Sequence, residues 1–179
     1  MSGNLFARSI HDLSAAAWFG GSLMGAIGLN GATSQAKDAT ERTRLSSLGW
    51  KKWAPVQTGA FAAHLASLGP ILWENKGRYT AQDSVMAATW IKTAVTAAGA
   101  AATLYAAILG KKVDELAAEG ARGATEPGAE TSADLAKAQK QLKLLQWVIP
   151  GVAAIVIVLG AWHGEMQRPK NVKLGLLKD

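Results

Sequence analysis

The stretch LLQWVIPGVAAIVIVLGAW, residues 144–162, decides the fold of this chain. Its nineteen residues carry no charge, and Ala153–Leu159 is almost purely aliphatic. Because an α-helix rises about 1.5 Å per residue, about 20 apolar residues cross roughly 30 Å of hydrocarbon. Trp147 and Trp162 lie near its two ends, where indole rings prefer the headgroup level of a membrane. The stretch is typical of a membrane-spanning helix, and a buried helix of a soluble core is the alternative.

Three more stretches of similar length are almost free of charge, at about residues 13–32, 54–73 and 85–109, and the 144–162 stretch extends to about residue 163. We therefore predict an all-α protein, an integral membrane four-helix bundle that forms a single domain over residues 1–179. Residues 33–53 and 74–83 are predicted to be polar loops between the spans. The chain has no cysteine, which excludes disulfides, iron–sulfur clusters and thiolate metal sites.

The connection at about residues 110–143 is predicted to be a helical hairpin that projects into the cytoplasm. KKVDELAAEGAR should prolong the third span, and the glycines and proline of residues 120–128 should end that helix. Thr131 and Asp134 resemble a capping box, which predicts a new helix that runs into the last span.

Positive charge is concentrated in two of the predicted connections. Residues 33–53 and 110–143 carry five and six Lys or Arg, of nineteen in the chain. The positive-inside rule places these connections in the cytoplasm and both termini outside. The net charge of +6 suits anionic lipid headgroups better than nucleic acid, because the basic residues flank the apolar spans. We therefore expect the lipid bilayer as a partner and no nucleic acid.

All three histidines should lie in the outer half of an antiparallel bundle. His11 and His163 lie at the outer ends of the first and last spans, and His64 lies within the second. His11 shares a helix stripe with Trp18 and with glycines whose spacing lets helices approach closely. Lys92 lies on a polar stripe of the third span with Thr89, Thr96, Gly99 and Thr103. A histidine deep in a span needs a partner, which for His64 should come from another helix.

Imidazole is a common ligand of haem iron and of copper. His163 and Met166, three residues apart in HGEM, offer a nitrogen and a thioether that suit copper(I). We expect His11, His64 and Trp18 to bind haem b or copper, and His163 with Met166 to be a candidate metal pair. For each histidine an ordinary packing or interfacial role is the alternative.

The stretch IHDLSAAAWFGGSL resembles the first helix of a loose superfamily of small bacterial membrane proteins. The pattern is a histidine seven residues before W-x-G-G, here His11, Trp18, Gly20 and Gly21. The superfamily includes copper-resistance D-like proteins and the four-helix membrane protoporphyrinogen oxidases. The resemblance implies a bacterial inner (plasma) membrane protein in which His11 ligates haem or metal. The chain lacks the L-P-R-L-F-V-Y-H continuation of the oxidases, so it implies no oxidase activity.

Two functions remain open, because the chain has no recognisable catalytic motif. The first is a haem- or metal-binding redox module in the outer half of the bundle. The second is a non-catalytic accessory or assembly subunit. Its glycine-rich faces would pack in a homo-oligomer or in a larger membrane complex.

Overall fold

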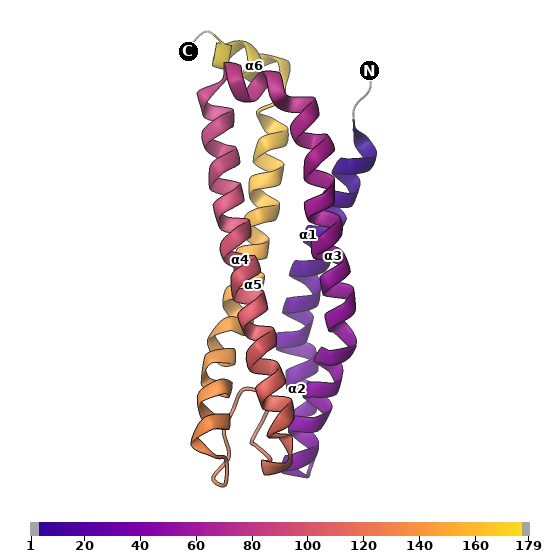
Figure 1. Ribbon diagram of the computed structural model, residues 1–179, viewed down its shortest axis with the longest axis vertical. Coiled ribbons are helices and arrows are strands. Elements are labelled where there is room, and N and C mark those ends of the chain that lie inside the picture. The colour runs from indigo at the N-terminus through magenta and orange to yellow at the C-terminus, as the bar shows by residue number, and fades with distance from the viewer. Residues whose placement is uncertain (1–3, 177–179) are drawn as a thin grey trace.

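A computed structural model describes residues 4–176, with side chains up to Val172. The chain forms an elongated bundle of long antiparallel helices with both described ends at the same end, drawn at the top of Figure 1 and called here the upper end. The helices are α1 (Leu5–Met24), α2 (Asn30–Thr33), α3 (Ala39–Ala81), α4 (Asp83–Glu115), α5 (Ala133–Glu165) and α6 (Pro169–Leu176). A π-helical turn, Gly25–Leu29, joins α1 to α2, and a 3₁₀ turn, Ala117–Glu119, follows α4. The described residues contain no β-strand, which agrees with the all-α prediction.

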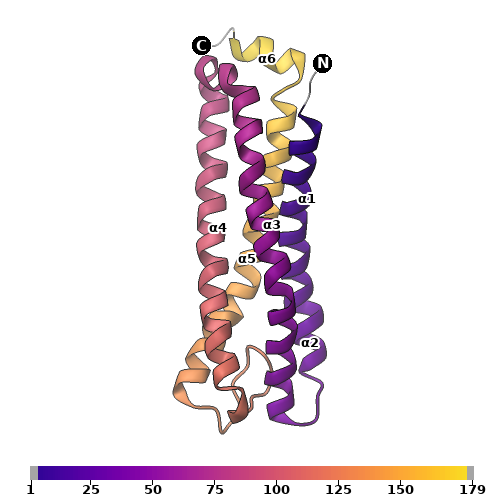
Figure 2. The same cartoon turned by 45° about the vertical axis from the view of Figure 1, so that its right-hand side comes forward.

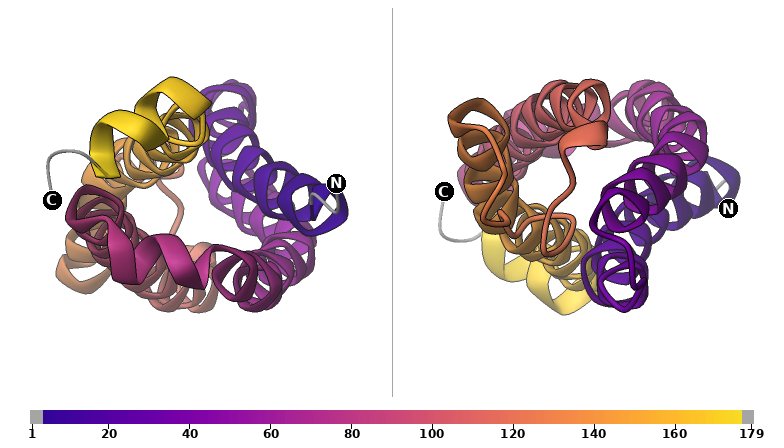
Figure 3. Two further views of the ribbon diagram at one scale, coloured as in Figure 1. Left: turned by 90° about the horizontal axis from the view of Figure 1, so that it is seen from above. Right: turned by 90° about the horizontal axis from the view of Figure 1, so that it is seen from below.

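The four long helices form a ring in which α1 lies between α3 and α5, and α4 completes the ring between α5 and α3. The turned view in Figure 2 and the end views in Figure 3 show the same arrangement, with α6 lying across the upper end. The main core cluster contains Trp18, Ile149, Ala153 and Val156, with Phe61 packed against it. Nearer the lower end, Leu109, Val113, Leu135 and Ala138 form a second cluster between α4 and α5.

The helices α4 and α5 are long and apolar enough to cross a membrane, and they are the two helices of residues 4–176 that meet this criterion. They contain the predicted spans 85–109 and 144–163. The predicted spans 13–32 and 54–73 are helical as well. Polar residues such as Gln57 and His64 make α3 less apolar, and α1 carries His11 and Asp12.

The prediction of a loop over residues 33–53 is wrong for most of its length. Helix α3 begins at Ala39, where the Asp38 side chain accepts a hydrogen bond from the backbone N–H of Glu41. This hydrogen bond lowers the pKa of the Asp38 carboxyl. Pro55 therefore lies inside a 43-residue helix, about 65 Å long, rather than near its start. Four of the five basic residues that suggested a loop, Arg42, Arg44, Lys51 and Lys52, lie on α3 near the lower end.

The predicted connection over residues 74–83 is also helical. Helix α3 continues to Ala81, and Gln82 alone separates it from α4. Gln82 has an extended backbone (φ −140°, ψ 102°) and is 3% exposed. Its backbone N–H donates to the carbonyl of Arg78, so this turn keeps its polar groups paired without a loop.

The hairpin at about residues 110–143 exists, but it does not project alone. Helix α3 runs beside it to the same lower level (Figure 1), and the N–H of Ala121 donates to the carbonyl of Ala39. Helix α5 begins after Ser132, whose side chain accepts from the N–H of Leu135. Thr131, predicted as the cap, instead accepts from the N–H of Gly128. The hairpin is therefore packed against α3 as part of the bundle.

The glycine stripe of α1 packs closely against α3, as its spacing predicts, but it receives indole rings rather than a helix backbone. A Cβ atom at Gly21 would overlap the ring of Trp53, and one at Gly25 would overlap the ring of Trp50. Neighbouring Gly20 has no atom within 4 Å of such a Cβ position. The stripe is thus a socket for two tryptophans.

Candidate functional site

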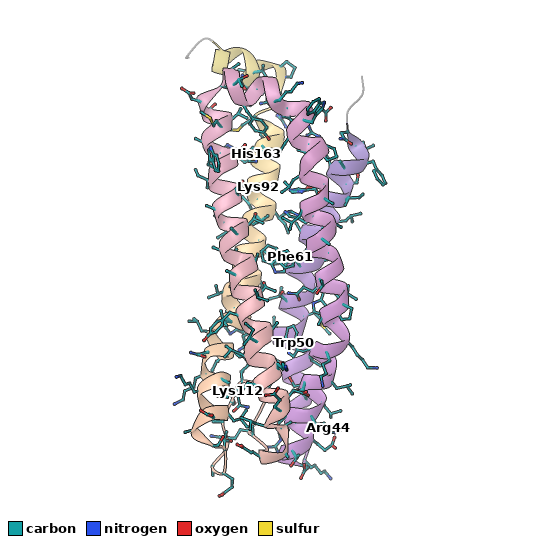
Figure 4. The ribbon with its side chains drawn as sticks, in the orientation of Figure 1. Arg44, Trp50, Phe61, Lys92, Lys112 and His163 are labelled. Atoms are coloured by element: carbon teal, nitrogen blue, oxygen red, sulfur yellow. The ribbon has the colours of Figure 1, made fainter. Side chains whose placement is uncertain are left out.

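A polar site lies inside the upper half of the bundle, where all four long helices contribute side chains. His11 comes from α1, His64 and Ser67 from α3, Lys92 from α4 and His163 from α5. Figure 4 labels Lys92 and His163, which lie close to each other in height near the upper end. His11, His64 and Ser67 are 5%, 3% and 5% exposed. The prediction that the histidines lie at one end of the bundle therefore agrees with the structure.

The rings of His11 and His64 are stacked, with centroids 3.8 Å apart and planes 22° apart. The Nδ1 atom of His64 is 3.1 Å from the backbone carbonyl oxygen of His11. Since a carbonyl only accepts, this Nδ1 carries the proton and donates it. The partner of His64 comes from another helix, as expected, and it is the backbone of His11.

His11 has a hydrogen-bond partner at each ring nitrogen. Its Nδ1 is 3.1 Å from Ser67 Oγ, and Ser67 donates its own proton to the carbonyl of His64. The proton between His11 and Ser67 must therefore be on Nδ1 of His11. Its Nε2 lies 3.0 Å from Lys92 Nζ and accepts from that ammonium group. A role for His11 as a metal ligand would require its hydrogen bond with Lys92 to break.

Space for Lys92 is provided by α5. A Cβ atom at Gly160 would lie 3.2 Å from Lys92 Nζ, so a larger residue there would crowd the ammonium group. The carboxylate of Asp12, an exposed residue on α1, is the negative charge that acts on Lys92. The site therefore holds a partly buried positive charge among imidazole rings.

Two imidazole nitrogens of the site are not hydrogen-bonded. Among the described side chains and backbone groups, nothing hydrogen-bonds to Nε2 of His64. The Nε2 atom of His163 is buried and also without a partner in the described part of the chain. A buried polar atom without a partner costs about 1–3 kcal/mol, so Nε2 of His163 is where a ligand would gain most. Nε2 of His64 is free to accept a ligand, but it is not one of the buried unpartnered atoms.

The remaining predicted residues, Trp18 and Met166, have contacts of their own. Trp18 lies two helical turns below His11, is 2% exposed, and donates from Nε1 to Thr103 Oγ1. Its ring packs against Phe61, with centroids 4.6 Å apart. Met166 is the residue after α5, and its carbonyl accepts from Arg78 Nη2. No group of three or more His, Asp or Glu that could hold a metal ion occurs within residues 4–172.

A second polar centre, around Asn30, was missed by sequence reasoning. Asn30 follows the π-helical turn, and its Oδ1 accepts from Ser46 Oγ and Trp50 Nε1. Its Nδ2 donates to Gln146 on α5. An asparagine in an otherwise apolar stretch is the signal that could have indicated this centre, whereas π-helical turns, which are frequent at functional sites, have no sequence signature here.

Comparisons with protein-family models, with curated proteins and with solved structures find no match to this chain.

Proposed function

We propose that this chain is a multi-pass integral membrane protein in which four segments cross the bilayer, at about residues 13–32, 54–73, 85–109 and 144–163. The apolar character of α4 and α5 supports this placement. Large apolar side chains on α1, on the π-helical turn after it and on α3 support it as well, since Leu13 is 71% exposed, Ile27 58% and Leu65 56%. Exposed apolar side chains on all four long helices suit lipid better than water.

The orientation follows from charge. The lower end carries the basic residues of 37–52 and 111–143, so we place it in the cytoplasm and both termini outside, in a bacterial inner membrane. Because the chain lacks cysteine, single cysteines report topology directly. Gly77→Cys, exposed near the upper turn, should react with a membrane-impermeant maleimide in intact cells. Glu130→Cys, exposed at the lower end, should react only after permeabilisation.

The opposite labelling pattern would invert the orientation. Labelling of both positions by the impermeant reagent in intact cells would contradict the membrane placement itself.

We further propose that the upper site binds a redox cofactor, haem b or copper, through Nε2 of His64. One observation carries this proposal: His64 is 3% exposed, its Nδ1 donates to a backbone carbonyl, and its Nε2 has no hydrogen-bond partner among the described residues. Metal-ligating histidines almost always donate the other ring N–H to a carbonyl or carboxylate, which fixes the tautomer. His163 presents a buried Nε2 without a partner among the described residues and is the candidate for a second ligand.

The free imidazole nitrogens of His64 and His163 suit haem iron or copper as ligands, whereas a cofactor does not fit between the stacked rings. Rings 3.8 Å apart leave no space for a macrocycle, and the socket of Gly21 and Gly25 is filled by tryptophans. In this proposal His11 orients His64 through its backbone and its ring. Haem or copper would supply one-electron chemistry when bound, and Lys92 would add a positive charge that favours the reduced state.

His64→Ala should remove the cofactor. Protein purified from cells supplied with haem precursor and copper should show either a Soret band or stoichiometric copper by elemental analysis, and His64→Ala should lose that signal. His11→Ala is the informative companion, because it removes the ring and keeps the carbonyl that accepts from His64. It should retain most of the signal, whereas loss in His11→Ala as well would make His11 a ligand.

A wild-type protein without colour and without metal would overturn the cofactor proposal. The accessory-subunit function would then be favoured, and its test is co-purification with a larger membrane complex. The same preparation thus separates the two functions.

A further inference from the structure

A groove of about 680 Å³ lies in the lower half of the bundle, separate from the histidine site. Side chains of α3 and α4 form most of its walls, and α5 forms its back through Leu142 and Ile149. Leu65 on α3 and Leu104 on α4 line it and are 56% and 66% exposed. The groove therefore opens sideways between these helices, on the surface that the proposed membrane placement turns toward lipid. Its volume is that of a typical site for a small molecule.

The middle of the groove offers hydrocarbon contacts and few free polar atoms. Trp50, Trp53 and Phe61 line it, and both indole N–H groups are already used, by Asn30 and by Gln57. The Asn30 side chain is itself bonded to three residues. Because these polar groups are paired, an occupant of this part would be bound through apolar contacts.

The lower end of the groove carries charge. Lys51, Lys111 and Asp114 line it, and Lys51 Nζ lies 2.6 Å from Asp114 Oδ2 across α3 and α4. Lys111 also lies 3.8 Å from Glu115 Oε1, but Glu115 is outside the lining and the Lys111 side chain is 80% exposed. Within the lining itself, these two positive groups and one negative group leave an excess of positive charge. Trp50 and Trp53 flank Lys51 in the sequence GWKKWAP, a composition typical of the headgroup level of a membrane. This end therefore favours an anionic headgroup.

The length of the groove matches one leaflet. Its lining on α3 runs from Ser46 to Leu65, and from Lys51 to Leu65 the helix rises about 21 Å. Half of a hydrocarbon core is about 15 Å, and the headgroup region adds several more. A chain that starts among the lysines would end near the bilayer midplane.

We propose that this groove binds an anionic phospholipid of the cytoplasmic leaflet, with one acyl chain along Trp50, Trp53 and Phe61 and the headgroup beside Lys51 and Lys111. The proposal rests on the membrane placement and is independent of the cofactor. A cysteine-labelling pattern that contradicts the membrane placement would overturn the placement and the lipid proposal together. A negative lipid experiment on a correctly inserted protein would overturn the lipid proposal alone.

Gly110→Phe is the variant that tests the groove. Gly110 lines it, and no atom lies within 4 Å of a Cβ placed there, so a phenyl ring can fill the groove without displacing the packing. Gly151→Phe on α5 is the matched control, because Gly151 has equally open surroundings and lies outside the groove. If Gly110→Phe does not fold, Ala107→Phe obstructs the same groove from an exposed position.

The measurement is a native mass spectrometry titration of the delipidated full chain with dioleoyl phosphatidylglycerol and dioleoyl phosphatidylcholine. The wild type should bind the anionic lipid about fivefold more tightly. Gly110→Phe should weaken that binding about tenfold, while Gly151→Phe stays within about twofold of the wild type. Lys111→Gln should bring the two lipids closer in affinity. Equal binding by the wild type and Gly110→Phe, or equal binding of both lipids by the wild type, would overturn the proposal.

Discussion

Trp18→Ala should destabilise the protein by about 3–5 kcal/mol, the usual cost of removing a large aromatic side chain from a packed core. Trp18 is 2% exposed and contacts Phe61 on α3, the surface of Gly99 on α4 and Val152 on α5. Removal of the indole would leave a cavity where all four long helices meet. The measurement is the melting temperature of the purified protein in detergent.

Two variants separate this packing role from other effects. Trp90→Ala is the control, because Trp90 is 68% exposed on the outer surface of α4, and its melting temperature should remain near that of the wild type. Trp18→Phe keeps most of the apolar surface and removes the hydrogen bond to Thr103, worth about 0.5–1.5 kcal/mol. If Trp18→Ala and Trp90→Ala had equal effects, Trp18 would not be at the centre of the core.

The antiparallel packing of consecutive helices could be predicted from the sequence, because long apolar runs joined by polar segments allow few helix arrangements. Consecutive runs joined by polar segments give antiparallel neighbours, which places His11, His64 and His163 at one end. Helix periodicity then turns His11, Trp18 and the polar stripe of α4 inward. That arrangement does not specify individual contacts, and the structure adds those of Lys92 with His11 and of Trp18 with the surface of Gly99.

The helix ends could not be predicted, because polar composition was interpreted as loop. Residues 39–53 contain Glu41, Arg44 and both lysines of the KK pair, all of which are good helix formers. An ion pair between Glu41 and Arg44, 2.9 Å apart, lies on this helix. High polarity indicates exposure to solvent, and a solvent-exposed segment can still be helical, so the loop prediction failed.

For the candidate site, the sequence could predict which residues lie near one another but not the contacts between their side chains. Sequence spacing places a ring on a helix face, but the rotamer and the register between helices decide whether two imidazoles stack or point at a common ligand. The glycine spacing indicates close helix approach, whereas Trp50 and Trp53 of α3 fill the space beside Gly21 and Gly25. Both tryptophans lie in the segment 33–53 that is predicted to be a loop, so this packing could not be predicted.

Gly21→Leu should prevent stable folding, while Gly20→Leu, one residue away on the same helix, should be tolerated. A side chain at Gly21 would occupy the position of the Trp53 ring, which is held by its hydrogen bond to Gln57. Overpacking of this kind costs about 1–3 kcal/mol, and more where the neighbour cannot move. Gly20 has open surroundings, so leucine there would displace no neighbouring group and would also improve helix propensity. The measurement is the yield and melting temperature of both variants from the same membrane preparation.

Gly21→Leu combined with Trp53→Ala should recover part of the lost stability, because alanine at position 53 leaves room for the leucine side chain. Equal stability of the two single variants would show that α1 does not pack on α3 through this face.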